Sequence, residues 1–217
     1  MRLLSVLAGT PRTVGTPQAP DPMERAYTSA IWKEPLTGPV WVGTLGIRGD
    51  AVAHPKVHGG PDQAVLMYAA SHYATWRAEW GRDISPGAFG ENLLVEGLTE
   101  TTACLGDVYA IGGARFEVSK PREPCATLAR RHRMRDMIAI VQANGRGGWY
   151  LRVLQEGEIE AGQEVILEGR PHPEWPVREA ALAVLERHSD PGRAARLAMC
   201  PALAANWKAR LSGRLTS

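Results

Sequence analysis

The sequence predicts a mainly β fold, either a barrel or a sandwich, followed by a small group of helices. Short runs of β-branched and aromatic residues alternate with glycine turns through most of the chain, and only two helical stretches interrupt them. The composition changes at Arg170, where three prolines precede an alanine- and leucine-rich stretch. We therefore expect one main domain at residues 1–169 and a three-helix extension at residues 170–217.

Short strands and one helix are expected in the first half of the chain. Residues 3–9 are apolar enough for a first strand, and residues 10–38 form a proline-rich loop crossed by at most one short strand, at 29–33. Residues 40–47 favour a strand that two glycines bend. From residue 69 to residue 80 large apolar side chains recur at helical spacing, and a glycine follows as a stop signal.

The second half alternates further strands with helices. A glycine pair at 112–113 splits residues 107–119 into a hairpin. The other expected strands are 92–96, 149–154 and 163–168. The expected helices are 135–143 in the main domain and 176–187, 191–198 and 201–210 in the extension.

Composition excludes several classes of protein. Of the 217 residues, 44% are hydrophobic and 22% are charged, and these globular proportions exclude general disorder. A net charge of +2 is too small to indicate a membrane or a nucleic-acid polymer as partner. The three cysteines, Cys104, Cys125 and Cys200, are widely spaced and odd in number, which favours a reducing cytoplasm over a disulfide framework. No apolar run is long enough to span a membrane.

One cluster of polar residues and glycines lies between a strand and the first helix. Its members are Arg48, Asp50, His54, Lys56, His58, Gly59, Gly60 and Asp62. Adjacent glycines expose backbone N–H groups, and nearby cations add positive charge, so an anion such as phosphate fits here. The alternative is a glycine turn with solvated charges. A metal pair of His54 and His58 would need a helix, which Pro55 and the glycines oppose.

A second cluster, residues 120–125, reads Lys-Pro-Arg-Glu-Pro-Cys. The two prolines stiffen this loop and hold the sulfur of Cys125 in one place. Lys120 and Arg122 favour the thiolate, which binds soft metals or attacks electrophiles. The alternative is a cysteine that is merely buried, and we assign that reading to Cys104 and Cys200.

Three further patterns carry weaker signals. Asn92 follows a Gly-Glu pair and is either a turn residue or a group that reads a heterocycle through its amide. Arg146 precedes two glycines in a turn that suits an anionic group. The arginines between residues 130 and 135 form either a solvated face or a site for phosphate or an acidic partner. Those of the extension, Arg178, Arg187, Arg193 and Arg196, form either a solvated helix face or a contact with an acidic partner protein or a second subunit.

The ordered set of motifs resembles the MOSC domain, which is shared with the C-terminal part of molybdenum cofactor sulfurases. The motifs are His58-Gly59-Gly60 with Ala64 and Tyr68, Gly90-Glu91-Asn92, Gly106-Asp107, Pro121-Arg122-x-Pro124-Cys125, and Gly148-Trp149-Tyr150-x-Arg152-Val153-Leu154. They cover about residues 30–168. The tail resembles the three-helix extension of the YiiM-type branch, which is similar to the hydroxylaminopurine reductases.

This resemblance implies a MOSC-type β-barrel that binds one molybdenum–molybdopterin cofactor. Cys125 would be the metal ligand and the catalytic residue, since a soft thiolate suits such a metal. The residues it implies for the cofactor pocket are Arg48, Lys56, His58, Gly59, Gly60, Asn92, Arg122 and Arg146.

The implied reaction is the reduction of N-hydroxylated compounds, including base analogues, to amines. The sequence contains no dinucleotide fingerprint, P-loop or ferredoxin-like cysteine run, so a separate flavin-type reductase is expected to supply electrons. A homodimer is compatible with the basic tail. Two alternatives stay open, namely a cofactor carrier or sulfur-transfer module, and a metal-free enzyme with Cys125 as nucleophile.

Overall fold

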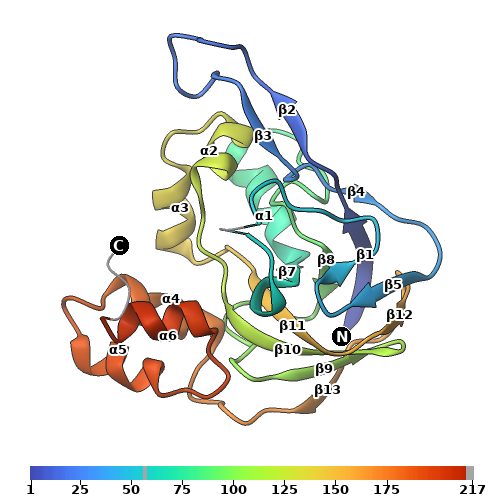
Figure 1. Ribbon diagram of the computed structural model, residues 1–217, viewed down its shortest axis with the longest axis vertical. Coiled ribbons are helices and arrows are strands. Elements are labelled where there is room, and N and C mark those ends of the chain that lie inside the picture. The colour runs from blue at the N-terminus through green and yellow to red at the C-terminus, as the bar shows by residue number, and fades with distance from the viewer. Residues whose placement is uncertain (56–57, 214–217) are drawn as a thin grey trace.

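The computed structural model describes residues 1–55 and 58–213, and over these residues it centres on an eight-stranded sheet that curls around a buried core (Figure 1). In spatial order the strands are β13 (Ile166–Gly169), β9 (Val108–Ile111), β10 (Ala114–Pro121), β11 (Trp149–Gln155), β7 (Val65–Ala69), β8 (Leu93–Glu96), β1 (Arg2–Ala8) and β4 (Glu34–Pro35). All neighbours are antiparallel except the parallel pair β7 and β8. The expected mainly β fold is confirmed.

Backbone hydrogen bonds join the segment before β13, at one edge of this curled sheet, to the start of β1, which is next to the other edge strand. The N–H of Leu3 donates to the oxygen of Gln163 at 2.9 Å, and the N–H of Val165 donates to the oxygen of Met1 at 2.9 Å. The segment before β13 thus lies against the start of β1 and closes a barrel. Side chains that alternate inward, such as Trp149 on β11, fill its interior with apolar contacts.

Two smaller sheets extend the barrel. One has the order β12 (Gly157–Ile159), β5 (Val40–Gly43) and β6 (Gly46–Ile47), and the other is a hairpin of β2 (Arg12–Val14) and β3 (Tyr27–Ser29). The hairpin projects away from the barrel at the top of Figure 1. It lies beside α2 (Ala126–His132), which is followed by α3 (Met137–Asn144).

A second hydrophobic cluster joins these helices to the outside of the barrel. It contains Tyr73 and Trp76 of α1 (Ser71–Trp80), together with Phe89, Leu128 of α2 and Val141 of α3. The short 3-10 helix η1 (Pro61–Gln63) precedes β7. The cluster fixes α2 against the barrel wall, and this placement matters for the site below.

The C-terminal extension consists of α4 (Val177–Leu185), α5 (Pro191–Ala198) and α6 (Ala205–Leu211). Its apolar residues, among them Val184 and Trp207, join the same buried core as the barrel residues. The backbone N–H of Val177 donates to the oxygen of Ala103 at 2.8 Å. The extension is therefore bound to the barrel by apolar packing and by backbone hydrogen bonds. No helix of the described residues is both long enough and apolar enough to cross a membrane.

Several expected elements differ from the structure. Residues 65–69 form β7, so α1 begins at residue 71 rather than at 69, and the strand expected at 29–33 lies at 27–29 instead. β7 is buried at every position, and a strand buried on both faces has no alternating pattern that would reveal it. The sequence also gave no signal for α2, and the last helix begins at residue 205 instead of 201.

Asp107 ties the extension to the barrel, because its fully buried carboxylate accepts from Arg170 Nε at 2.8 Å and from Tyr109 Oη at 2.8 Å. We expect Asp107→Ala to lower the free energy of unfolding by about 3 kcal/mol or more, since it leaves buried donors unpaired. Urea titration measures this loss. Glu168→Ala, which removes an exposed ion pair with Arg115, should cost less than about 1 kcal/mol. Equal losses for the two variants would contradict the prediction.

Candidate functional site

A cavity of about 510 Å³ opens between the barrel, the residues after β3 and the start of α2. We call it the Cys125 cavity. Its lining residues come from stretches of chain that are distant in the sequence, within 29–33, 45–55, 58–66, 89–92 and 122–127, together with Tyr150. This volume is typical of sites for cofactors and small molecules. The three sequence clusters around His58, Asn92 and Cys125 each contribute to the lining.

Cys125 lies at the N-terminal cap of α2, with its carbonyl accepting the backbone N–H of Leu128 at 3.0 Å. It is partly exposed and lines the cavity, whereas Cys104 and Cys200 are buried elsewhere. The loop before it is held from two sides. The N–H of Arg122 donates to the oxygen of Gly148 at 3.0 Å, and Glu123 forms an ion pair with Arg210 of α6 at 2.8 Å.

Arg122 is a buried cation in the cavity wall. The residue is only 8% exposed, and it forms no ion pair with any described residue. Its Nη1 atom also has no hydrogen-bond partner among these residues. A buried guanidinium without a counter-ion is costly, so an anionic ligand would stabilise this arrangement. Nearby, burial lowers the pKa of Lys120 to about 8.

His58, Gly59 and Gly60 also line the cavity. Burial lowers the pKa of His58, and the positive charges of Arg122, His54 and Lys120 lower it further. Both glycines have positive φ, 83° and 86°, which other residues adopt only with strain. Lys56 lies outside the described residues.

Asn92 belongs to the cavity wall, but the protein itself uses its amide. Its Oδ1 accepts the N–H of Leu66 at 3.0 Å, and its Nδ2 donates to Asp50 Oδ2 at 2.9 Å. Asp50 also pairs with Lys33, which is buried. Asn92 therefore connects β7, β8 and the loop after β6. Sequence reasoning did not single out Lys33, because nothing local in the sequence links it to Asp50.

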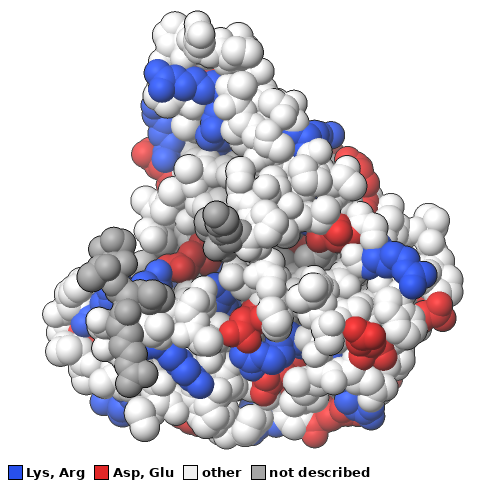
Figure 2. All heavy atoms as spheres, viewed as in Figure 1, with Lys and Arg blue, Asp and Glu red and all other residues white. Residues whose placement is uncertain are grey.

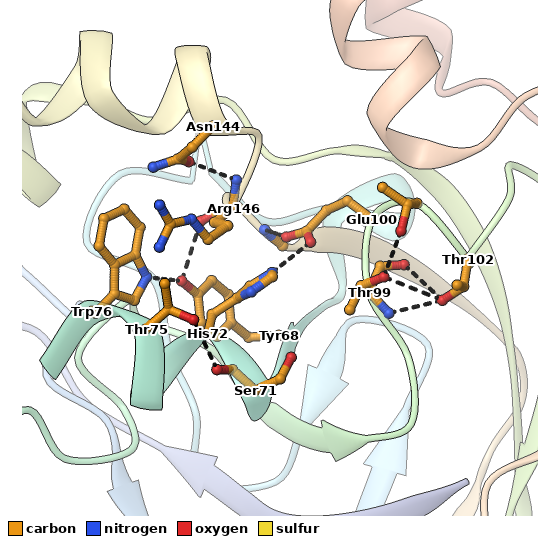
Figure 3. Close-up of polar contacts among 12 residues, drawn as sticks. Tyr68, Ser71, His72, Thr75, Trp76, Thr99, Glu100, Thr102, Asn144 and Arg146 are labelled. Carbon is orange, nitrogen blue, oxygen red and sulfur yellow. Dashed lines mark hydrogen bonds and ion pairs between the residues drawn. The ribbon is translucent and has the colours of Figure 1, made fainter. Parts of the chain in front are cut away.

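Arg48 and Arg146 lie outside the lining of the cavity. The Arg48 side chain is exposed, and its backbone N–H donates to Trp41. Arg146 forms an ion pair with Glu79 at 2.7 Å, and its guanidinium lies 4.0 Å from the ring centroid of Trp76. Figure 3 shows it beside Trp76 and Tyr68, at the turn between α3 and β11.

A buried histidine–carboxylate pair supports that turn and was missed from the sequence. Nε2 of His72 lies 2.6 Å from Glu100 Oε2 (Figure 3), and Glu100 Oε1 accepts the N–H of Gly148 at 2.7 Å. His72 and Glu100 lie 28 positions apart. Neither has a neighbouring motif in the sequence that would mark it. Their contribution to the cavity passes through Gly148, whose oxygen accepts the N–H of Arg122.

His132, at the end of α2, holds the helix against the cavity wall. Its Nε2 lies 3.0 Å from the oxygen of Ala88, and its ring packs against Phe89 and Trp80. Burial lowers the pKa of His132 to about 4, and nearby arginines lower it further. The folded protein therefore keeps this imidazole neutral at pH values where an exposed histidine is charged.

We expect stability to fall as the pH drops from about 6.5 to about 4, because only the unfolded chain protonates His132 in this range. His132→Gln keeps a donor for Ala88 but does not titrate, so its stability should depend less on pH, by up to about 3 kcal/mol over this range. Urea unfolding at several pH values measures both slopes. His188→Gln, at an exposed site, is the control. Equal slopes for the wild type and His132→Gln would contradict the prediction.

Known proteins resemble this chain in sequence over the main domain and over most of its length. A family model described as the MOSC domain matches residues 54–166, just over half of the chain. Protein YiiM of Escherichia coli is 35% identical over 196 residues, covering 86% of this chain and 87% of that protein. A protein named "Reductase" from Gibberella moniliformis is 37% identical over 165 residues, which cover 74% of this chain but only 29% of that protein.

A solved structure agrees with the sequence matches. The crystal structure of YiiM from Geobacillus stearothermophilus superposes with a TM-score of 0.81 at 33% identity and covers 99% of each chain. The agreement extends over the barrel and the helical extension alike. The chain therefore belongs to the MOSC domain family, in the branch that contains the YiiM proteins.

Proposed function

We propose that this protein is an oxidoreductase that binds a molybdenum–molybdopterin cofactor through Cys125 and reduces N-hydroxylated compounds to amines. One observation carries the proposal. The cysteine that opens into the large cavity lies three residues from a buried arginine that has no counter-ion among the described residues. A soft metal ligand and a binding group for an anion thus share one cavity.

The residues present fit such a cofactor. Cys125 would bind the metal, because thiolates favour soft metal ions. Arg122 and the backbone N–H groups of the Gly59-Gly60 turn would hold the anionic phosphate of the pterin. Membership of the MOSC family supports this assignment, and the name of the fungal relative supports an oxidoreductase. We expect Arg48, Arg146 and Asn92 to contribute less, because the first two lie outside the lining and the third is bonded within the protein.

The reaction that we propose takes two electrons and two protons to convert R–NHOH into R–NH₂ and water. When bound, the cofactor would supply the electrons to the N–O bond. The chain's own groups would orient the substrate and hold protons. Nζ of Lys120 lies 5.4 Å from the ring centroid of Tyr150, and Tyr150 lines the cavity. Because the pKa of Lys120 is about 8, its ammonium group holds a proton near neutral pH. The electron donor in this proposal is a separate flavoprotein.

Molybdenum content tests the proposal directly. Protein produced in a host that makes the cofactor should contain about one molybdenum and one pterin per chain, and Cys125→Ala should lose most of the metal. Elemental analysis and pterin fluorescence measure both. Cys104→Ala and Cys200→Ala remove the buried thiols and should keep the metal. A metal-free wild type from such a host would contradict the proposal.

Activity separates the proposed enzyme from its alternatives. With reduced methyl viologen as electron source, the loaded protein should convert 6-hydroxylaminopurine to adenine. A carrier or sulfur-transfer module would contain the metal but would not turn over this substrate. A metal-free cysteine nucleophile would form a covalent adduct at Cys125 and would need no molybdenum.

Arg122→Met provides a second test, with opposite effects on ligand binding and on folding. Removing a buried cation that has no counter-ion within the described part of the chain should leave the free energy of unfolding of the cofactor-free protein unchanged or raise it. Retention of the cofactor should fall about tenfold or more, because a charge-assisted contact with its phosphate is lost. Urea unfolding and pterin release measure the two effects. Arg115→Met, on the strand that leads to Arg122 but ion-paired at the surface, is the control. A merely structural role for Arg122 would appear as destabilisation of the cofactor-free protein.

A further inference from the structure

Arginines gather on the β2–β3 hairpin and on α2, next to the Cys125 cavity. We call this set the arginine rim, and its members are Arg12, Arg25, Arg130, Arg131, Arg133 and Arg135. Figure 2 shows Lys and Arg side chains along one side of the projecting lobe that Figure 1 identifies as the hairpin and α2. The same stretches of chain contain only three carboxylates, Asp21, Glu24 and Asp136. The lobe therefore carries an excess of positive charge.

Among the described residues, seven of the fourteen arginines outside the rim form ion pairs with Asp or Glu, whereas only one of the six rim arginines does. Ion pairs with Asp or Glu are formed elsewhere by Arg77, Arg115, Arg146, Arg152, Arg170, Arg193 and Arg210. On the rim, only Arg135 has such a partner among the described residues, namely Asp21. The remaining guanidinium groups keep their full charge.

Contacts that do not neutralise charge hold the rim in place. The Arg130 guanidinium lies 3.8 Å from the ring centroid of Tyr27, and that of Arg12 lies 4.5 Å from the ring centroid of Trp32. Arg131 donates to the backbone oxygen of Ile31. Cation–π contacts and backbone hydrogen bonds fix a guanidinium but leave it positive. The rim is thus a preformed cationic surface.

Its position relates it to the cavity. Cys125 is the N-cap of α2 and Arg133 is the C-cap, so the helix extends about 12 Å from the cavity wall to the far end of the rim. On the side of the hairpin, Ser29 and Ile31, which follow Tyr27 in the chain, line the cavity. A molecule seated on the rim would lie beside the opening to Cys125.

We propose that the arginine rim is the docking surface for the acidic face of the flavoprotein that supplies electrons to this cavity. The inference rests on the proposed reduction, in which the donor's reduced flavin becomes oxidised and releases two electrons and two protons. Unpaired, fixed cations steer an acidic protein and align it. A small anion would need only two or three of these groups. Nucleic acid fits less well, because guanidinium groups cover the rings on which bases would stack.

Flavodoxin, an acidic FMN protein, is the probe. We expect titration calorimetry to show that it binds the wild-type protein more weakly at high salt than at low salt. Arg12→Glu combined with Arg133→Asp should weaken this binding at least about tenfold, and Asp is tolerated at the left-handed backbone of residue 133. Arg196→Glu, at an exposed residue on α5 without an ion pair among the described residues, should bind like the wild type.

The outcomes separate this inference from the proposed function. The double variant should keep the wild-type rate with reduced methyl viologen and lose rate with reduced flavodoxin. Equal flavodoxin binding by wild type and double variant, or no binding by either, overturns the docking surface. A double variant that loses affinity for a single-stranded oligonucleotide but keeps flavodoxin overturns it in favour of nucleic acid. Rim-dependent binding of flavodoxin without any turnover under viologen supports the docking surface and contradicts the proposed reduction.

Discussion

The buried carboxylate of Glu100 holds together three segments that lie far apart in the sequence. One oxygen accepts the N–H of Gly148 at 2.7 Å, and the other lies 2.6 Å from Nε2 of His72 (Figure 3). Its peptide oxygen accepts the N–H of Arg178 at 2.7 Å, at the start of α4. Since the residue is only 4% exposed, these charge-assisted bonds replace its lost hydration. The glycine turn, and through it the backbone of Arg122, depends on this group.

The extension acts on the same cavity from outside. The N–H of Ala205 at the start of α6 donates to Asp62 Oδ2 at 2.9 Å, just after the Gly59-Gly60 turn. Arg210 at the other end of α6 pairs with Glu123, two residues before Cys125. One short helix thus braces two loops of the cavity wall. The change of composition at Arg170 separates two stretches of sequence, whereas the core and the cavity wall are built from both.

Local patterns predicted the elements whose signals are local. The hairpin at residues 112–113 and the helices of the extension follow from glycine turns and periodicity, and the structure contains them. β7 was missed because its burial is uniform, and α2 was missed because its sequence, ATLARRH, has too few apolar residues for a recognisable stripe. The pairs Lys33–Asp50 and His72–Glu100 exist only through long-range contacts. The family resemblance predicted that His58, Asn92 and Cys125 share one pocket, and in the structure all three line the Cys125 cavity.

The counter-ions of the arginines are set by long-range contacts that the sequence does not show. Arg146 and Arg122 both lie beside glycine or proline turns, and the family resemblance assigned both to the cofactor pocket. In the structure, Glu79 neutralises Arg146, while Arg122 is buried without a counter-ion among the described residues. The rim arginines are a third case, because aromatic rings hold them and their charge stays available. The capacity of a guanidinium to bind an anion depends on which carboxylates the fold brings to it, and that information is not local in the sequence.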